Sequence, residues 1–174
     1  IIARVGKKTF QEQLKEKIFD QLGMRHSQAI GDYNQVIPNK AYSYVVITNG
    51  ITNNPVKIST MGASGVYASL NDLIVWAQEF TKNDTKNQQY LKLMQKETIL
   101  NTNKSIAYGM GIQFENYKGV DILFHGGGTE SYRSYTLHAP EHDVSLVFLS
   151  NAGGFSGYEI VYRSLDTILE LETK

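Results

Sequence analysis

The hydrophobic pattern of the chain changes its period past the midpoint, and this change limits the folds that are possible. Residues 106–115 alternate between apolar and small or polar side chains, which predicts a half-buried strand with a glycine-rich outer face. Residues 120–125, 132–139 and 144–150 are predicted to form three further strands, separated by turn sequences at 116–119 and 140–143. Strands joined by such short connections indicate an antiparallel meander.

Helices are predicted before and after these strands. Three Ser or Thr residues are followed three positions later by Glu or Asp, which is the pattern of a capped helix start. A stripe of apolar residues follows the first cap and stops at Gly23, a typical C-terminal signal. A shorter helix is expected around residues 88–95, and residues 1–5 are expected to end a helix that Gly6 closes. The caps are Thr9 with Glu12, Ser69 with Asp72, and Ser156 with Glu159; the predicted packing faces are Phe10, Leu14, Ile18 and Leu22, then Leu73, Trp76, Ala77 and Phe80, then Tyr158, Val161, Leu165, Ile168 and Leu169.

The order of these elements predicts the fold class. Helices come first, a meander follows, and a C-terminal helix returns over the sheet. This is an α+β arrangement of an antiparallel sheet flanked by helices, and three layers are expected. The strand at 144–150 (VSLVFLS) is apolar on both faces and is expected to be covered on both sides. Residues 24–58 lack periodicity except for a possible strand at 42–48, and loops of this length are often functional.

Composition excludes several classes of function. The 17 basic and 17 acidic residues of the 174-residue chain cancel without a basic patch, so nucleic acid is not an expected partner. The absence of cysteine excludes disulfides, thiol catalysis and Cys-ligated zinc. The four histidines show no metal-ligand spacing, and neither a metal nor a cofactor is predicted. His26, His138 and His142 are expected to have structural or solvent-exposed positions.

The fourth histidine, His125, stands in the segment FHGGGTESYRS, where three glycines follow a predicted strand. Backbone N–H groups there could hold a developing oxyanion, and the glycines would let a substrate backbone lie along the strand. A glycine-rich bulge with a locally bonded imidazole explains the same pattern. A phosphate loop does not, because a strand rather than a helix is predicted next. No Gly-x-Ser-x-Gly or Ser-x-x-Lys nucleophile motif occurs in the sequence.

Four segments together carry a resemblance to a known family. The chain resembles the C-terminal half of the serine β-lactamase-like hydrolases, the superfamily of class C β-lactamases, D-alanyl-D-alanine carboxypeptidases and related esterases. The segments occur in the order found in that family and extend through most of the chain. They are FQEQLKEKIFDQLGMRHS, IPNKAYSY, GVYASLNDLIVWAQEF and the run from YGMGIQFENY to LSNAGG.

The resemblance implies the candidate site. His125, Gly126 and Gly127 match the third motif of the family, often Lys-Thr-Gly with His-x-Gly as a variant, and the Gly128 N–H matches an oxyanion donor. His125 and Gly128 are thus the implied catalytic residues, and Gly126 and Gly127 the implied substrate-binding residues. Gly126 replaces a threonine that helps to bind a carboxylate, and His125 makes a permanent charge conditional. Both changes favour an esterase, amidase or D-peptidase over a true β-lactamase.

The resemblance also implies that residues 1–174 are a single incomplete domain. The Ser-x-x-Lys and Tyr-x-Asn motifs of the family are absent, and Ser69-Leu70-Asn71 matches a helix cap instead. We therefore expect a truncated product of a bacterial serine hydrolase that is inert alone and whose partner is the missing N-terminal segment. The expected substrates are small esters, amides or D-amino-acid peptides, and the resemblance favours periplasm, cell envelope or secretion.

Two further expectations follow from this interpretation. The alternative to a hydrolase is a non-catalytic, penicillin-binding-like relative that binds peptide or envelope polymer; loss of Ser-x-x-Lys upstream would support it. Apolar surface and a strand edge left uncovered by the missing segment predict self-association of the isolated chain. A monomer by light scattering at high concentration would contradict that expectation.

Overall fold

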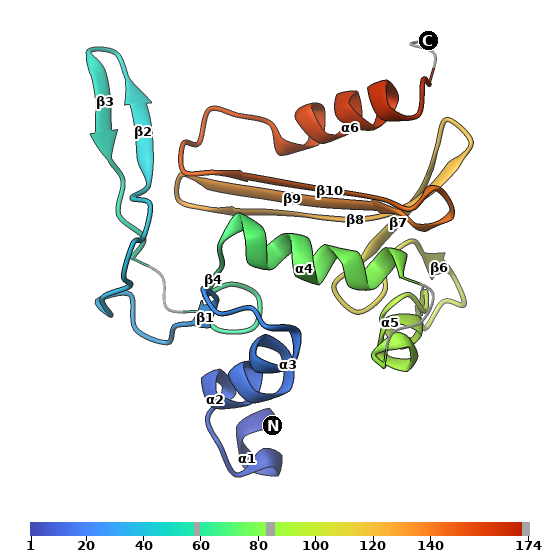
Figure 1. Cartoon of the computed structure of the whole chain (residues 1–174), viewed down its shortest axis with the longest axis horizontal. Helices are drawn as coiled ribbons and strands as arrows, with labels where there is room; N and C mark the ends of the chain where they lie inside the picture. Colours follow the sequence, from blue (N-terminus) through green and yellow to red (C-terminus); the bar gives the residue numbers. More distant parts are fainter. Residues whose placement is uncertain (58–59, 83–85, 172–174) are drawn as a thin grey trace. The chain divides into compact units, whose positions relative to one another are not determined.

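The computed structural model describes residues 1–57, 60–82 and 86–171 of the chain. These residues form two compact units. Figure 1 shows the chain coloured by residue number, from blue at the N-terminus to red at the C-terminus. Unit 1 comprises Ile1–Trp76, Gly128–Arg133 and Ser150–Phe155, and unit 2 comprises Ala77–Gly127, Ser134–Leu149 and Ser156–Lys174. Helices and antiparallel strands make up both units, so the α+β prediction is confirmed.

In unit 1 the helical run between Thr9 and Gly23 starts and stops where the sequence predicts. Thr9 forms the expected capping box: its Oγ1 accepts from the Glu12 N–H at 3.2 Å, and its own N–H donates to Glu12 Oε2 at 2.7 Å. Gly23 ends the run with a left-handed φ of 73°. The first helix, however, is closed by Lys7 at φ 53° and not by Gly6. The elements are α1 (Ile2–Gly6), α2 (Phe10–Leu14), η1 (Lys15–Phe19) and α3 (Asp20–Leu22).

The middle of this helical run is a π-helix, η1. Its wider turn explains why the apolar stripe Phe10, Leu14, Ile18 and Leu22 keeps a spacing of four residues. On a regular α-helix of 3.6 residues per turn, a four-residue step drifts by about 40° each time. The wider π turn offsets part of this drift. The four stripe residues are half-buried, and Phe19, which lies outside the predicted stripe, is buried.

The long aperiodic region of unit 1 contains more strand than the sequence predicts. The predicted strand at 42–48 is confirmed as β2 (Tyr44–Ile47), which pairs with β3 (Gly50–Asn53) in a hairpin. A second small pair joins β1 (Gln28–Ala29) to β4 (Val66–Tyr67). The last predicted position of this region, residue 58, lies outside the described residues.

A buried carboxylate joins two segments of unit 1. Asp72 lies in the first turn of α4 (Leu70–Thr81), where its N–H donates to Ser69 Oγ at 3.2 Å as the cap prediction requires. The Asp72 carboxylate also accepts from the His26 N–H at 2.8 Å and from Ser27 Oγ at 2.7 Å. It therefore fixes the chain after α3 against the start of α4, a second role that the cap pattern did not reveal.

Unit 2 is built on a four-stranded antiparallel sheet in the order β10-β9-β8-β7. Helix α6 (Gly157–Ile168) covers one face and the second half of α4, from Ala77, covers the other (Figure 1). The predicted three layers are thus present within unit 2. The strands are β7 (Gln113–Tyr117), β8 (Val120–Thr129), β9 (Tyr132–Ala139) and β10 (Val144–Ser150); the smaller elements are α5 (Gln88–Met94), β5 (Thr98–Ile99), β6 (Ser105–Ile106) and η2 (Pro140–His142).

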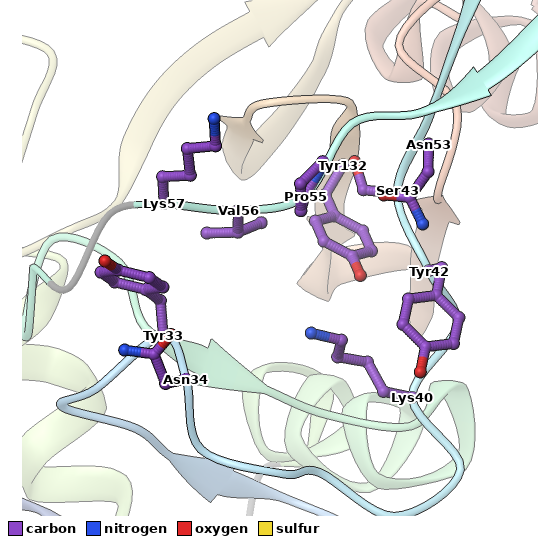
Figure 2. Close-up of a pocket in the computed structure, with 10 residues that line it drawn as sticks. All are labelled: Tyr33, Asn34, Lys40, Tyr42, Ser43, Asn53, Pro55, Val56, Lys57 and Tyr132. Carbon is purple, nitrogen blue, oxygen red and sulfur yellow. The ribbon is translucent and has the colours of Figure 1, made fainter.

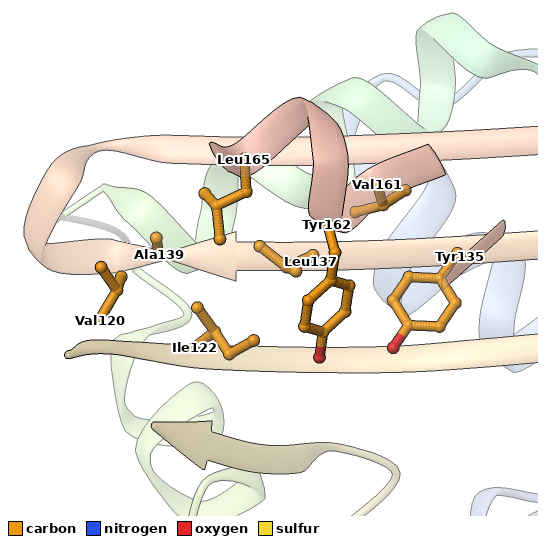
Figure 3. Close-up of a cluster of buried hydrophobic side chains, with 8 residues drawn as sticks. All are labelled: Val120, Ile122, Tyr135, Leu137, Ala139, Val161, Tyr162 and Leu165. Carbon is orange, nitrogen blue, oxygen red and sulfur yellow. The ribbon is translucent and has the colours of Figure 1, made fainter. Parts of the chain in front are cut away.

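The core of unit 2 lies between the sheet and α6 (Figure 3). Leu137 and Leu165 are completely buried there, and Tyr162 donates to Glu115 Oε2 at 2.7 Å. Burial and this carboxylate raise the pKa of Tyr162 far above its ordinary value, so its hydroxyl stays a donor. The packing face of α6 is shifted from the prediction: Tyr162 is buried, whereas Tyr158 and Ile168 are about half exposed. The whole cluster is Val120, Ile122, Tyr135, Leu137, Ala139, Val161, Tyr162 and Leu165.

The predicted strand at 106–115 is wrong. The chain leaves β6 at Ile106, turns through Gly109–Ile112 and enters β7 only at Gln113. The Gly109 N–H donates to the Ile112 carbonyl at 2.8 Å, and Gly111 has a φ of 78° that an alternating strand cannot adopt. A Cβ on Gly109 would lie 2.0 Å from the Met94 carbonyl oxygen. The glycines that looked like the outer face of a strand therefore form a tight turn.

The buried histidine of unit 2 is His138, on the face of the sheet that α4 covers. Its ring stacks on Phe80 at 4.4 Å between centroids, and its Nδ1 lies 3.0 Å from Ser145 Oγ. The Ser145 hydroxyl donates in turn to the Ala77 carbonyl at 3.2 Å, so the His138 Nδ1–H donates to Ser145. Burial lowers the pKa of His138 to about 4, and the predicted structural role is confirmed.

This histidine makes the stability of the chain depend on pH. The folded pKa of about 4 lies below the ordinary 6.5, so between these values the unfolded chain binds a proton that the folded chain does not. The free energy of unfolding is therefore highest above pH 6.5 and decreases as the pH falls from 6.5 through 4. The loss is about 3 kcal/mol for a shift of this size. His138→Phe is expected to remove this part of the pH dependence, as measured by urea unfolding across that interval. The control is the exposed His142→Gln; an unchanged slope for His138→Phe would contradict the assignment.

Candidate active site

The candidate site lies along β8, which continues through the three glycines instead of ending at His125. Strand β7 pairs with β8 only as far as Phe124, which lies opposite Gln113. From His125 to Gly128, β8 has β9 on one side, and among the described residues no strand continues β7 on the other. The predicted strand end at 125 is therefore wrong, and this part of β8 is an open edge.

The turn between β7 and β8 decides which amides face that edge. Tyr117 and Val120 flank a two-residue turn, Lys118–Gly119, in which both φ angles are positive at 50° and 89°. Such a hairpin closes on a hydrogen-bonded pair, so the Val120 N–H faces β7. Every second amide along β8 has the same direction. The N–H groups of Gly126 and Gly128 thus face the edge beyond the end of β7.

The three glycines of this segment differ in how much space their neighbours leave for a side chain. A Cβ on Gly127 would lie 2.4 Å from Ser134 Oγ, so β9 requires glycine there. A Cβ on Gly126 would lie 3.1 Å from the Tyr135 ring, which is a tight contact. A Cβ on Gly128 would lie 3.5 Å from its nearest neighbour, Arg133 Nη1, which is an ordinary contact. Packing does not explain the third glycine, and Gly127 and Gly128 are exposed.

His125 is half-buried on β8, and its imidazole has a partner that the sequence did not suggest. Its Nε2 lies 3.0 Å from the Tyr108 hydroxyl, with the two rings edge to face at 6.0 Å. Tyr108 forms an isolated antiparallel bridge with Gln113, so it lies where β7 begins. Depending on its tautomer, the imidazole can donate to or accept from this phenol. The predicted strand at 106–115 concealed Tyr108 as a site residue, because it placed this side chain on an uninterrupted strand.

The turn that follows β8 is held within unit 1. Ser131 is buried, its N–H donates to Ser43 Oγ at 3.2 Å, and its hydroxyl accepts from Asn54 Nδ2 at 2.9 Å. The Arg133 guanidinium donates to the carbonyls of Glu130 and Tyr132, both at 2.8 Å. Together these bonds fix the turn that positions Gly128.

Unit 1 also contains a cavity of about 280 Å³ beside this turn (Figure 2). Tyr132, the first residue of β9, forms one wall and donates its hydroxyl to the Ala41 carbonyl. Burial, with the neighbouring tyrosines, raises the pKa of Tyr132 to about 12, so the phenol is neutral. The cavity is lined by Tyr33, Asn34, Lys40, Tyr42, Ser43, Asn53, Pro55, Val56, Lys57 and Tyr132.

The remaining histidines do not join either site. His26 and His142 are exposed, and His138 lies in the core. In the part of the chain that the structure describes, no three His, Asp or Glu side chains are grouped as metal ligands. None of the helices within the described ranges has the length and apolar character that crossing a membrane requires.

Comparison with known proteins decides the family. The Beta-lactamase family model matches residues 1–166, nearly the whole chain. The chain belongs to the Beta-lactamase family. A D-aminopeptidase of Brucella anthropi is 26% identical over 164 residues, which cover 93% of this chain and 31% of the relative. This member of the Beta-lactamase family thus spans about a third of the length of that curated relative.

Solved structures show that the chain has the fold of the Beta-lactamase family. The octameric penicillin-binding protein homologue from Pyrococcus abyssi matches with a TM-score of 0.83 and 23% identity, over 97% of this chain and 40% of that protein. The D-amino acid amidase from Ochrobactrum anthropi SV3 matches with a TM-score of 0.71 and 20% identity, over 98% and 54%. Identities this low establish the fold alone. Self-association of the present chain stays a prediction.

Proposed function

We propose that the chain provides the third active-site motif of a serine acyl-transfer hydrolase that acts on amides or peptides of D-amino acids. The observation that supports this most is the open edge of β8, where the Gly128 N–H faces away from β9. Family membership and the D-aminopeptidase and D-amino acid amidase relatives favour amide over ester substrates. The nucleophile would come from sequence outside these 174 residues, since no Ser-x-x-Lys occurs among them.

In this proposal the edge of β8 receives the substrate. A peptide laid along His125–Gly128 would add a short strand to the sheet, and the missing side chains of the glycines let its backbone come close. The serine Oγ attacks the carbonyl carbon and the C–N bond breaks, so that the amine leaves with the proton lost by the serine and an acyl-enzyme forms. Water then cleaves this ester, releasing the carboxylic acid and restoring the serine hydroxyl. The Gly128 N–H would stabilise the oxyanion together with the N–H of the serine.

His125 has the supporting role at the first position of the motif. Its Nε2 is within hydrogen-bond distance of the Tyr108 hydroxyl, so the two groups can share a proton with a bound substrate. If this role is correct, replacing His125 or Tyr108 should lower the turnover rate and change its dependence on pH.

The test uses the chain expressed together with any coding sequence that precedes Ile1 in its gene. We expect release of p-nitroaniline from a D-amino acid p-nitroanilide, with the L-isomer as control, and covalent labelling by a serine-directed phosphonate. Chain 1–174 alone serves as the negative control. Absence of both labelling and turnover would refute the hydrolase and favour the non-catalytic, peptide-binding alternative.

A further inference from the structure

The cavity of unit 1 has a charge character that its tyrosines do not explain. Lys40 and Lys57 are the only charged residues in the described lining, which contains no carboxylate. Figure 2 shows the Lys40 ammonium directed into the space between Tyr132, Val56 and Asn34, whereas the Lys57 ammonium points away from it. One positive charge therefore faces the hollow.

The Lys40 ammonium is held in place by aromatic faces. It lies 5.7 Å from the centre of the Tyr42 ring and 5.5 Å from that of Tyr67. Among the described residues no Asp or Glu pairs with it. Ring faces attract an ammonium but leave its donors available for an anion. The site is thus positioned for a negative charge that the described residues do not supply.

The other walls suit a flat apolar body. Tyr132 is fixed by its bond to Ala41 and by an edge-to-face contact with Tyr67 at 6.0 Å between centroids. Pro55 and Val56 line the same cavity. Its volume of about 280 Å³ lies just below the range of ligand pockets, which is typically about 300–1,000 Å³.

We propose that this cavity binds a small aromatic carboxylate, whose charge pairs with the Lys40 ammonium while its ring lies against Tyr132. Binding needs neither the nucleophile nor the β8 edge, so the inference can stand or fall separately from the hydrolase proposal. An ammonium–carboxylate bond is stronger than a bond to a neutral amide. The cavity should therefore distinguish an acid from its amide.

The test is a protein-detected NMR titration of chain 1–174 with phenylacetate and with phenylacetamide, at low salt. We expect phenylacetate to bind about tenfold more tightly, which is the size of effect for a hydrogen bond between charged groups. Lys40→Met should raise the Kd of phenylacetate about tenfold and leave phenylacetamide unchanged. Lys40→Arg should keep the preference, and the exposed Lys92→Met on α5 is the matched control.

Each other outcome overturns the inference. Equal binding of the two probes would show that the cavity does not select charge, and no binding of either would show that it is not a ligand site. If Lys40→Met still preferred phenylacetate over phenylacetamide, Lys40 would not be the residue that binds the carboxylate. If Lys92→Met lost this preference, the selection of charge would not be specific to Lys40. Far-ultraviolet circular dichroism checks that each variant is folded. If Lys40→Met is unfolded, the parent chain is titrated at high salt instead. Salt screens the ion pair, so the preference for phenylacetate should then be lost, and a preference that persists would overturn the inference.

Discussion

Replacing Gly128 with proline is expected to lower the kcat of the proposed hydrolase by a factor of about 10²–10³, the usual effect of removing one oxyanion donor. Proline has no N–H, and β8 presents the Gly128 amide at an edge where β7 has already ended. Proline is tolerated on an edge strand when its nitrogen faces away from the ladder. The free energy of unfolding should therefore change little while the rate falls.

The control for this experiment is Gly128→Ala, measured in the same completed protein. A Cβ at this position would meet Arg133 atoms at no less than 3.5 Å, so alanine fits and keeps the N–H. Its kcat should stay within a few-fold of the parent. If Gly128→Pro kept its rate, the amide would not be an oxyanion donor. If it unfolded the chain, the amide would instead be bonded within the fold.

Replacing Leu165 with alanine is expected to destabilise the chain by about 3 to 5 kcal/mol, the range for large-to-small changes in a closed core. Leu165 lies on α6 in the cluster of unit 2, and none of its surface is exposed. Stabilities of whole domains are about 5 to 15 kcal/mol, so the loss is a large part of the total. Urea unfolding followed by circular dichroism measures it.

The matched control is Ile168→Ala on the same helix. Ile168 is 51% exposed, so its truncation should cost less than about 1 kcal/mol. Equal losses for the two variants would mean that α6 does not pack on the sheet through Leu165. This comparison also tests the shifted packing face, because the sequence predicted both residues to be buried.

Local signals in the sequence predicted the local parts of the fold. The caps at Thr9, Ser69 and Ser156 each depend on a residue three positions away, and each forms a hydrogen bond in the structure. The hairpin turn at 116–119 is equally local. These features were predictable because the interacting groups are neighbours in the chain, where backbone geometry alone brings them together.

The features missed by the sequence depend on distant partners or on glycine in turns. Alternation at 106–115 was indistinguishable from a strand, since the turn at Gly109–Ile112 is stabilised by contact with Met94. Without that turn, Tyr108 could not be placed beside His125. The cavity brings Tyr33 and Tyr132 together across about a hundred residues, and no periodicity reports such an encounter. That the Gly128 amide has no partner in β7 followed only from the observed end of that strand.

The π-helix η1 has a consequence for aligning this chain with others. A π turn arises when one residue is added to an α-helix without disturbing the flanks. A homologue with a regular α-helix here would therefore align best with a one-residue gap between Lys15 and Phe19. Placing the gap elsewhere would rotate the matched positions by about 100° and pair core residues of one protein with surface residues of the other.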